Sequence, residues 1–393
     1  MQYKFSSRVQ NVPNSGIGFM MRYASKYKDV ISLGQGTPQF PTPQFIYDYL
    51  YERAKTDKKV GMYSDPGIEA ELKQLIAKQI KNNHEFTPSP DELYLTLGGI
   101  GGLYAACMSF LEKGDQAIYF DPSYPLHLAQ IHLTQAKPIF VPFKEDQKWA
   151  IDLDKLENSI TRKTKIVVLT NPNNPTGTVL SEKEVKQLAK IIIDHNLILL
   201  LDEAYEFLTY DTELYSPLNI AKLRNNLIVC RSFSKEFAMT GWRLGYLYAN
   251  PEIISKLREV HLHFCISPPT PAIVACIGAL SDKRGEEAKQ HFKSKFTESR
   301  GTICERFDRL PKLFSYQKPA GAYYVFPKIT GLKLSSLEFA KLLVDEAKVI
   351  TIPGSTMGPS GEHHLRMSFA ADPTVINQAF DRIDDFAKRH DLL

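Results

Sequence analysis

Arg231-Ser232-Phe233-Ser234-Lys235 follows the apolar run Leu227-Ile228-Val229-Cys230 and precedes Glu236-Phe237-Ala238-Met239. The apolar run is typical of a buried strand, so the polar residues mark a turn at its end. A lysine held near apolar side chains has a lowered amine pKa, because desolvation disfavours the ammonium. The neutral amine can then form a Schiff base with a carbonyl carbon. In isolation, the ordinary interpretation of Lys235 is a strand-end lysine that points to water.

Length and composition indicate a globular protein with a large and a smaller domain. The chain has 393 residues, and 43% of them are hydrophobic. Its 48 basic and 44 acidic residues nearly balance, which gives no case for a nucleic-acid or membrane partner. No apolar run approaches the roughly 18 residues of a membrane span, and the start lacks a signal core, so we expect a cytoplasmic protein. The five cysteines have neither disulfide nor zinc spacing.

Two segments in the first part of the chain are candidate ligand contacts. The loop Gly34-Gln35-Gly36-Thr37-Pro38 allows close backbone approach at its glycines, although by itself it is most simply an ordinary Gly/Pro loop. Apolar spacing predicts helices over 43–55 and 68–82, with Tyr63 in the loop between them.

The second segment is rich in glycine. A strand is predicted over 93–97, and Gly98-Gly99-Ile100-Gly101-Gly102 leads into a helix over 103–111. A helix N-terminus presents free backbone N–H groups and the positive end of the helix dipole, which suit a phosphate. The segment lacks the Gly-Lys-Ser/Thr ending of a P-loop, and a simple tight turn is the alternative.

The middle of the chain predicts a mostly parallel sheet. Continuous apolar runs indicate strands that are buried on both faces. The ends of parallel strands gather along one edge, where an open α/β sheet binds its ligand. Strands are expected over 116–120, 138–143, 165–170, 197–201 and 227–230, and polar groups near their ends are Tyr124, Asn174, Asp202 and Tyr205.

The C-terminal part changes character. Residues 268–309 suggest a long connecting helix, and residues 321–327 suggest a hairpin. Arg366 lies inside an apolar strand, so it requires an anionic partner, either a structural carboxylate or the carboxylate of a substrate. Glu362-His363-His364 lacks metal-ligand spacing and is expected to face solvent, and we expect no metal.

The fold class follows from this order of elements. We expect an α/β protein whose large domain, residues 46–284, contains a mostly parallel sheet covered by helices on both faces. The two chain ends, residues 1–45 and 285–393, are expected to form a smaller α+β domain.

Four motifs occur in one order: Asn174-Pro175-Thr176-Gly177, Asp202-Glu203-Ala204-Tyr205, Ser232-Phe233-Ser234-Lys235 and Gly241-Trp242-Arg243-Leu244-Gly245. In order and spacing, the chain resembles the fold type I aminotransferases of the aspartate aminotransferase superfamily (class I/II), which use pyridoxal 5'-phosphate (PLP). The resemblance extends from Gly34 to Phe369. It implies transamination between an L-amino acid and a 2-oxo acid.

The resemblance implies a role for each matched residue. Lys235 would hold PLP as an internal aldimine and then move a proton between the substrate α-carbon and the cofactor, with pyridoxamine phosphate as the intermediate. Asp202 would pair with the pyridine nitrogen and keep it protonated. Tyr205 and Asn174 would hydrogen-bond the phenolic oxygen, and Tyr124 would stack on the ring.

The resemblance also implies how the phosphate is bound. Its ligands would be backbone N–H groups around Gly99 and Ile100, the hydroxyls of Ser232 and Ser234, and Arg243. Ile100 departs from many relatives, which carry a polar side chain there, but its backbone could still donate.

Two further implications concern the substrate and a second subunit. Arg366 would grip the substrate α-carboxylate, with help from Asn174 and the Gly36 backbone. Tyr63 would reach the phosphate of the neighbouring subunit, which implies a homodimer with shared active sites.

The residues leave the exact reaction and the substrate open. β-Elimination, cyclisation or oxidase-type chemistry could use the same scaffold, because PLP supplies the electron sink in all of them. An apolar or aromatic wall would favour larger or neutral amino acids, although core packing explains its candidate residues equally well. These candidates lie near Ile17, Tyr63, Tyr124 and Tyr323.

Overall fold

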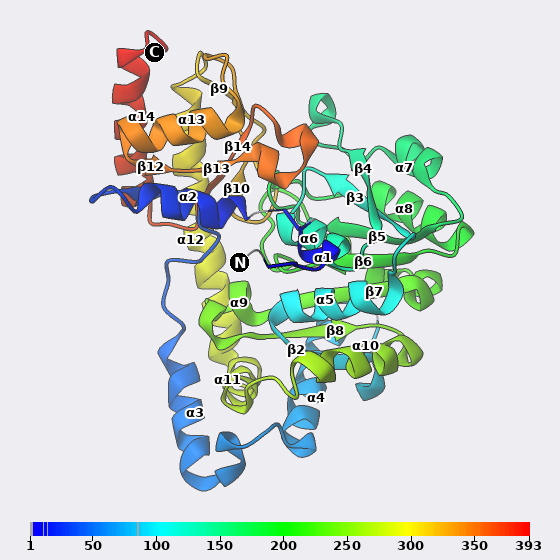
Figure 1. Cartoon of the computed structure of the whole chain (residues 1–393). Coiled ribbons are helices and arrows are strands. Elements are labelled where there is room, and N and C mark those ends of the chain that lie inside the picture. The colour runs from blue at the N-terminus through cyan, green and yellow to red at the C-terminus, as the bar shows by residue number, and fades with distance from the viewer. Residues whose placement is uncertain (1–2, 11, 14, 85) are drawn as a thin grey trace.

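A seven-stranded sheet organises the larger part of the chain in the computed structural model, which describes residues 3–10, 12–13, 15–84 and 86–393 (Figure 1). The strand order is β2-β8-β7-β6-β5-β3-β4, and β8 runs antiparallel to both of its neighbours. The other neighbouring pairs are parallel, as expected. The strands are β2 (Leu93–Leu97), β3 (Gln116–Asp121), β4 (Lys137–Pro142), β5 (Thr164–Thr170), β6 (Ile198–Asp202), β7 (Leu227–Ser232) and β8 (Leu244–Tyr248).

Helices pack on both faces of this sheet, and alternate strand residues fill two separate apolar cores. In β7, Ile228 and Cys230 belong to the core that also contains residues of α5 and α10. Leu227 and Val229 belong to the other core. The same alternation places Ser232 on the face of Cys230 and puts Arg231, one position earlier, on the opposite face.

Two helices of this part, α3 (Gln44–Thr56) and α4 (Pro66–Asn83), begin and end close to the predicted ranges 43–55 and 68–82. Helix α5 (Gly98–Phe110) begins before its predicted start at residue 103. The other helices are α6 (Pro125–Leu133), α7 (Leu153–Ser159), α8 (Glu182–Asp194), α9 (Phe233–Glu236), α10 (Pro251–Phe264), α11 (Thr270–Ser281) and α12 (Lys283–Asp308).

The two ends of the chain meet in a smaller part, where Figure 1 shows the blue helix α2 beside the orange and red elements. Strand β1 pairs in parallel with β12, and β14 lies between β10 and β13. The exact domain boundaries stay a prediction. The elements are α1 (Ser7–Gln10), α2 (Gly16–Ala24), β1 (Ile31–Ser32), β9 (Phe314–Ser315), β10 (Tyr324–Val325), β11 (Lys328–Ile329), α13 (Ser336–Leu342), β12 (Val349–Ile350), β13 (Ile352–Pro353), β14 (Leu365–Ser368) and α14 (Pro373–Arg389).

Two sequence predictions about the C-terminal part are wrong. The predicted long helix over 268–309 is two helices, because Asp282 breaks it and caps α12 by accepting a hydrogen bond from the Arg284 backbone N–H at 2.9 Å. The predicted hairpin over 321–327 does not form, since β10 pairs with the distant strand β14 and β11 pairs with β9. Among the described residues, no helix is long and apolar enough to cross a membrane.

Candidate active site

A cavity of ≈ 430 Å³ opens where β6 and β7 end, beside the N-terminus of α5. Elements from both chain ends close it, including Ile17 of α2 and Arg366 of β14. All the predicted site residues except Tyr63 line this cavity. They are Gly36, Gly99, Ile100, Tyr124, Asn174, Asp202, Tyr205, Ser232, Ser234, Lys235, Arg243 and Arg366.

Lys235 enters the cavity from the single-turn helix α9, which follows β7 directly. Its Nζ donates a hydrogen bond to the Gly36 carbonyl at 2.5 Å and lies 5.9 Å from the centre of the Tyr323 ring. Burial lowers the pKa of Lys235 to about 8, and the charges of Arg366 and Arg243 act in the same direction against Asp202. The amine is therefore partly neutral near physiological pH.

Asp202 ends β6 and is 6% exposed. Its Oδ2 lies 3.1 Å from His127 Nε2, and its Oδ1 accepts a hydrogen bond from the Ala204 backbone N–H at 3.1 Å. His127 is also buried, and its Nδ1 has no partner in the described structure. A carboxylate oxygen can only accept, so Nε2 of His127 would carry the hydrogen that bridges to Asp202.

The sequence interpretation did not single out His127. It is three residues after Tyr124, and the two rings contact edge to face at 5.4 Å. Tyr124 immediately precedes α6, so a spacing of three places both side chains on one side of the helix start. The spacing of three residues between Tyr124 and His127 is the sequence pattern from which His127 could have been predicted as a site residue.

A cluster of donors lies at the start of α5. The helix begins at Gly98 rather than at residue 103, so the glycine segment forms its first turn. Gly98 has a φ of +63°, and a Cβ there would approach Arg243 Nη2 to 2.5 Å. The first helical turn leaves backbone N–H groups without helical acceptors, and the side chains of Ser232, Ser234 and Arg243 line the same cavity.

Arg366 is fully buried at the opposite side of the cavity. Its Nη2 donates to the Gly34 carbonyl at 2.7 Å and its Nη1 to Asn174 Oδ1 at 3.3 Å, while its Nε has no partner. Arg366 forms no ion pair with any carboxylate in the described ranges. The sequence left two possible partners for Arg366, a structural carboxylate or the carboxylate of a substrate. Within the described ranges the structural carboxylate is excluded, so a bound anion is the partner that remains.

Tyr324 lines the cavity, and it is another residue of the candidate site that the sequence interpretation did not single out. Its hydroxyl lies 2.9 Å from that of Tyr205, and its ring lies 4.7 Å from the Arg366 guanidinium. Burial raises the pKa of Tyr205 well above its ordinary value, and Tyr324 adds to this effect. A Cβ on Gly36 would come within 1.9 Å of the Tyr324 hydroxyl, so this close approach requires a glycine.

Tyr63 is not brought to this cavity. Its side chain is on the surface, 73% exposed, beside a second hollow of ≈ 730 Å³ between the 60–63 loop and the start of α11. Its predicted contact with a neighbouring subunit stays a prediction. Tyr323 is buried, so core packing explains it, while Ile17 and Tyr124 do line the cavity.

The expected exposure of residues 362–364 is wrong for His364, which is 2% exposed. Its ring stacks on Phe326 at 4.9 Å, and its nitrogens contact Glu145 and the Glu362 carbonyl. In the described ranges, no group of three or more His, Cys, Asp or Glu side chains is placed to hold a metal ion.

Comparisons with known proteins agree on one family. The sequence model of the family "Aminotransferase class I and II" matches residues 28–383. The chain is 33% identical to the aspartate aminotransferase of Pyrococcus horikoshii, over 98% of this chain and 97% of that protein. It is 32% identical to aromatic-amino-acid aminotransferase 2 of Thermococcus litoralis, over 99% of each.

A solved structure gives the same result at the level of the fold. The aromatic aminotransferase of Pyrococcus horikoshii superimposes with a TM-score of 0.88 and 31% identity. The match covers 95% of this chain and 100% of the other.

Proposed function

Because the chain belongs to the class I and II aminotransferase family, we propose that the cavity around Lys235 is the active site of its PLP-dependent transamination. The reaction transfers the amino group of an L-amino acid to a 2-oxo acid. One observation carries the assignment of the site. A lysine with a lowered pKa, the buried carboxylate of Asp202 and an arginine without an anionic partner, Arg366, all line one cavity.

The residues of the cavity fit PLP. A volume of ≈ 430 Å³ falls within the range of roughly 300–1,000 Å³ that is usual for small-molecule sites. At one end, a helix N-terminus, two serine hydroxyls and Arg243 have the chemistry of a phosphate site. A side chain at Gly98 or Gly99 would narrow that end, because its Cβ would meet Arg243 or Cys230.

The other side chains can orient the ring. PLP supplies an electron sink for the negative charge that develops at the substrate α-carbon. Asp202 would hold the proton on the ring nitrogen, and His127 would keep that carboxylate in place through its hydrogen bond. Tyr124 would cover one face of the ring. Tyr205 and Asn174 would hydrogen-bond the phenolic oxygen.

Lys235 would serve both as an attachment point and as a base. Its Nζ is the group of this chain that would hold the cofactor, through the aldehyde carbon. The freed amine, whose pKa is lowered to about 8, would then take the proton from the substrate α-carbon. The Gly36 carbonyl, which accepts from Nζ at 2.5 Å, would orient the amine in the meantime.

Arg366 would bind the α-carboxylate of the amino acid. Its guanidinium is held in place by Gly34 and Asn174, and its Nε is free for a charge-assisted hydrogen bond. With its α-carboxylate bound by Arg366, the substrate would place its side chain against the other residues that line the cavity.

The preferred substrate would be an amino acid with a neutral side chain. In the described ranges, the cations that line the cavity are Lys235, Arg243 and Arg366, and each already has a role above. A second carboxylate, as in aspartate, would therefore be buried without a partner from this chain, which is costly. The apolar lining residues Ile17 and Leu126 suit an aliphatic or aromatic side chain instead.

The proposal is tested by mixing the PLP-loaded protein with single amino acids and following the absorption of the bound cofactor. We expect aromatic or aliphatic amino acids to convert the cofactor, a 2-oxo acid to restore it, and aspartate to react at least about tenfold less efficiently. The Lys235→Ala variant is the control and should not react. If no amino acid converts the cofactor, transamination at this site is refuted, and if aspartate reacts best, the substrate class is wrong.

We also propose that the protein is a homodimer. The exposed side chains of Tyr63 and Met62 line the ≈ 730 Å³ hollow, and they are 73% and 63% exposed. Ile266, which is 62% exposed, directly precedes Ser267, another residue of the lining. An apolar surface of this kind favours contact with another protein surface. A second copy of the chain on this face would bring its Tyr63 toward the phosphate end of the cavity, as the family resemblance implies.

A further inference from the structure

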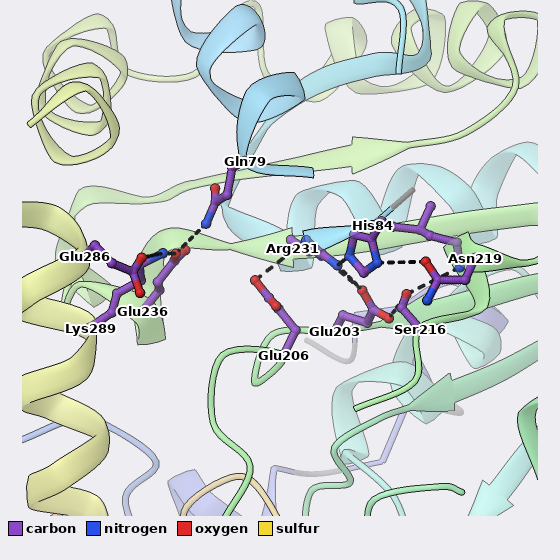
Figure 2. A network of polar contacts seen from close by, with 11 residues as sticks. Gln79, His84, Glu203, Glu206, Ser216, Asn219, Arg231, Glu236, Glu286 and Lys289 are labelled. Carbon is purple, nitrogen blue, oxygen red and sulfur yellow. Dashed lines mark hydrogen bonds and ion pairs between the residues drawn. The ribbon is translucent and has the colours of Figure 1, made fainter. Parts of the chain in front are cut away.

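A buried cluster of charged side chains contains Glu236, the residue that follows Lys235 in the chain (Figure 2). Lys235 lines the cavity, whereas the side chain of the next residue, Glu236, contacts α4 and α12 instead. Consecutive residues of a helix point in directions about 100° apart, so neighbours on a single turn must have different surroundings. Glu236 is 7% exposed, which is unusual for a carboxylate unless it is paired.

Glu236 has two partners from distant parts of the chain. Gln79 of α4 donates to its Oε1 at 2.8 Å, and Lys289 of α12 lies 3.3 Å from the same oxygen. Burial raises the pKa of Glu236, and Lys289 opposes this rise. Burial alone would lower the pKa of Lys289, but Glu236 and Glu286 together raise it. The pair therefore favours the charged form of the lysine.

A second buried ion pair, between Arg231 and Glu203, links the end of β7 to the end of β6 (Figure 2). Arg231 donates to Glu203 Oε2 from Nε at 3.0 Å and from Nη2 at 2.7 Å. It also lies 3.6 Å from Glu206. Glu203 follows Asp202 and Arg231 precedes Ser232, so this pair joins the ends of β6 and β7 on the face away from the cavity.

The turn between these two anchors has little stability of its own. Helix α9 comprises four residues, and its N-cap is Ser232, whose hydroxyl accepts from the Ser234 backbone N–H at 3.2 Å. Isolated helices of this length are unstable, so tertiary contacts must fix the turn. A displacement of the reacting amine by about 1 Å is enough to lower a catalytic rate on the order of a hundredfold.

We propose that Glu236 is a positioning residue, whose ion pair with Lys289 and hydrogen bond from Gln79 hold the α9 turn so that Lys235 Nζ reaches its reaction partners. The inference rests on the proposed role of Lys235. It adds that α12, the helix that leads from α11 toward α14, fixes the placement of the reactive amine through Lys289.

The Glu236→Gln variant tests this proposal, because it keeps the size of the side chain and an acceptor for Gln79 but loses the charge that attracts Lys289. We expect kcat to fall by about tenfold or more while KM for the amino acid stays unchanged, since Arg366 is untouched. In the cofactor-free protein, acylation of Lys235 at different pH values reports its pKa independently of turnover. A displaced, better solvated amine should show a midpoint above that of the wild-type protein.

The double variant Glu236→Gln with Lys289→Met removes both charges, so it leaves no unpaired buried ion. It should lower kcat and raise the acylation midpoint in the same way, and it replaces the single variant if that variant fails to fold. Arg306→Met is the matched control on the same helix, because it breaks ion pairs with Asp384 and Asp381 away from Lys235. This control should lower the melting temperature and leave kcat and the acylation midpoint unchanged.

Wild-type values of kcat and of the midpoint in both Glu236 variants would overturn the inference, as would an equal change in the Arg306→Met control. Failure of the wild-type protein to react with any amino acid would instead contradict the proposed function, and the acylation midpoint would still report the placement of Lys235.

Discussion

The Lys235 amine lies among charges that act on it in opposite directions. Burial lowers its pKa, Arg366 and Arg243 lower it further, and Asp202 raises it. An exposed lysine such as Lys186 has the opposite shift, because Glu182 raises the pKa of its amine. The two lysines of one molecule should therefore differ in reactivity at a single pH.

We predict that acylation of Lys235 in the cofactor-free protein rises with pH and is half-maximal near pH 8. The neutral amine is the nucleophile, so a lowered pKa moves the reactive range to lower pH. Mass spectrometry of a digest can follow Lys235 and the internal control Lys186 together. A Lys235 midpoint at or above that of Lys186 would contradict the prediction.

Local sequence predicted most of the residues that line the cavity. Lys235 and Asp202 each follow an apolar strand, and their motifs occur in a recognisable order. The sequence does not predict His127 and Tyr324 as site residues, because the contacts that define their roles are with residues distant in the chain. His127 contacts Asp202, and Tyr324 contacts Tyr205 and approaches Gly36. Such contacts depend on tertiary packing, so the spacing of Tyr124 and His127 indicates a shared side of α6 but does not identify Asp202 as the partner of His127.

The helices and strands were predictable where one local cause dominates. Continuous apolar runs predict the strands of the large sheet. At the start of α8, the structure has a full capping box between Ser181 and Glu184, which is a purely local cause. The start of α5 was placed too late because glycine usually weakens a helix. Here the glycines permit close packing, since a Cβ on Gly102 would come within 2.8 Å of Leu247.

Short strands of the smaller part could not be placed by pattern. Strand β10 has two residues, and its partner β14 lies about forty positions later in the chain. Adjacent residues that look like a hairpin compete with such distant pairings, and side-chain burial decides the outcome. Likewise, an acid within a long helical pattern, Asp282, was the cap of a new helix rather than a surface residue.

In the molecule as a whole, the position of an exposed apolar surface bears on assembly. It surrounds Tyr63 and lies at the 60–63 loop and the start of α11. A second copy of the chain that covers this surface would complete each phosphate site with a tyrosine from its partner. Assembly and cofactor binding would then be linked.

We predict that the wild-type protein is a dimer and that Ile266→Glu yields a monomer that binds PLP more weakly. A charge in the interface would be buried without a partner, which disfavours association. Tyr63→Phe is the matched variant: it should remain a dimer and lose about tenfold in PLP affinity, because one hydrogen bond to a charged group is missing. Light scattering and PLP titration measure both effects. A wild-type monomer, or unchanged PLP affinity in Tyr63→Phe, would contradict this arrangement.

Attachment of the cofactor to Lys235 is the role on which the other proposed roles in the cavity depend. Borohydride reduction of the PLP-loaded protein, followed by peptide mass spectrometry, measures this directly. We predict one reduced cofactor per chain, attached to Lys235, and none in the Lys235→Ala variant. A cofactor trapped mainly on another lysine, or equal trapping in the variant, would show that Lys235 is not the residue that binds PLP.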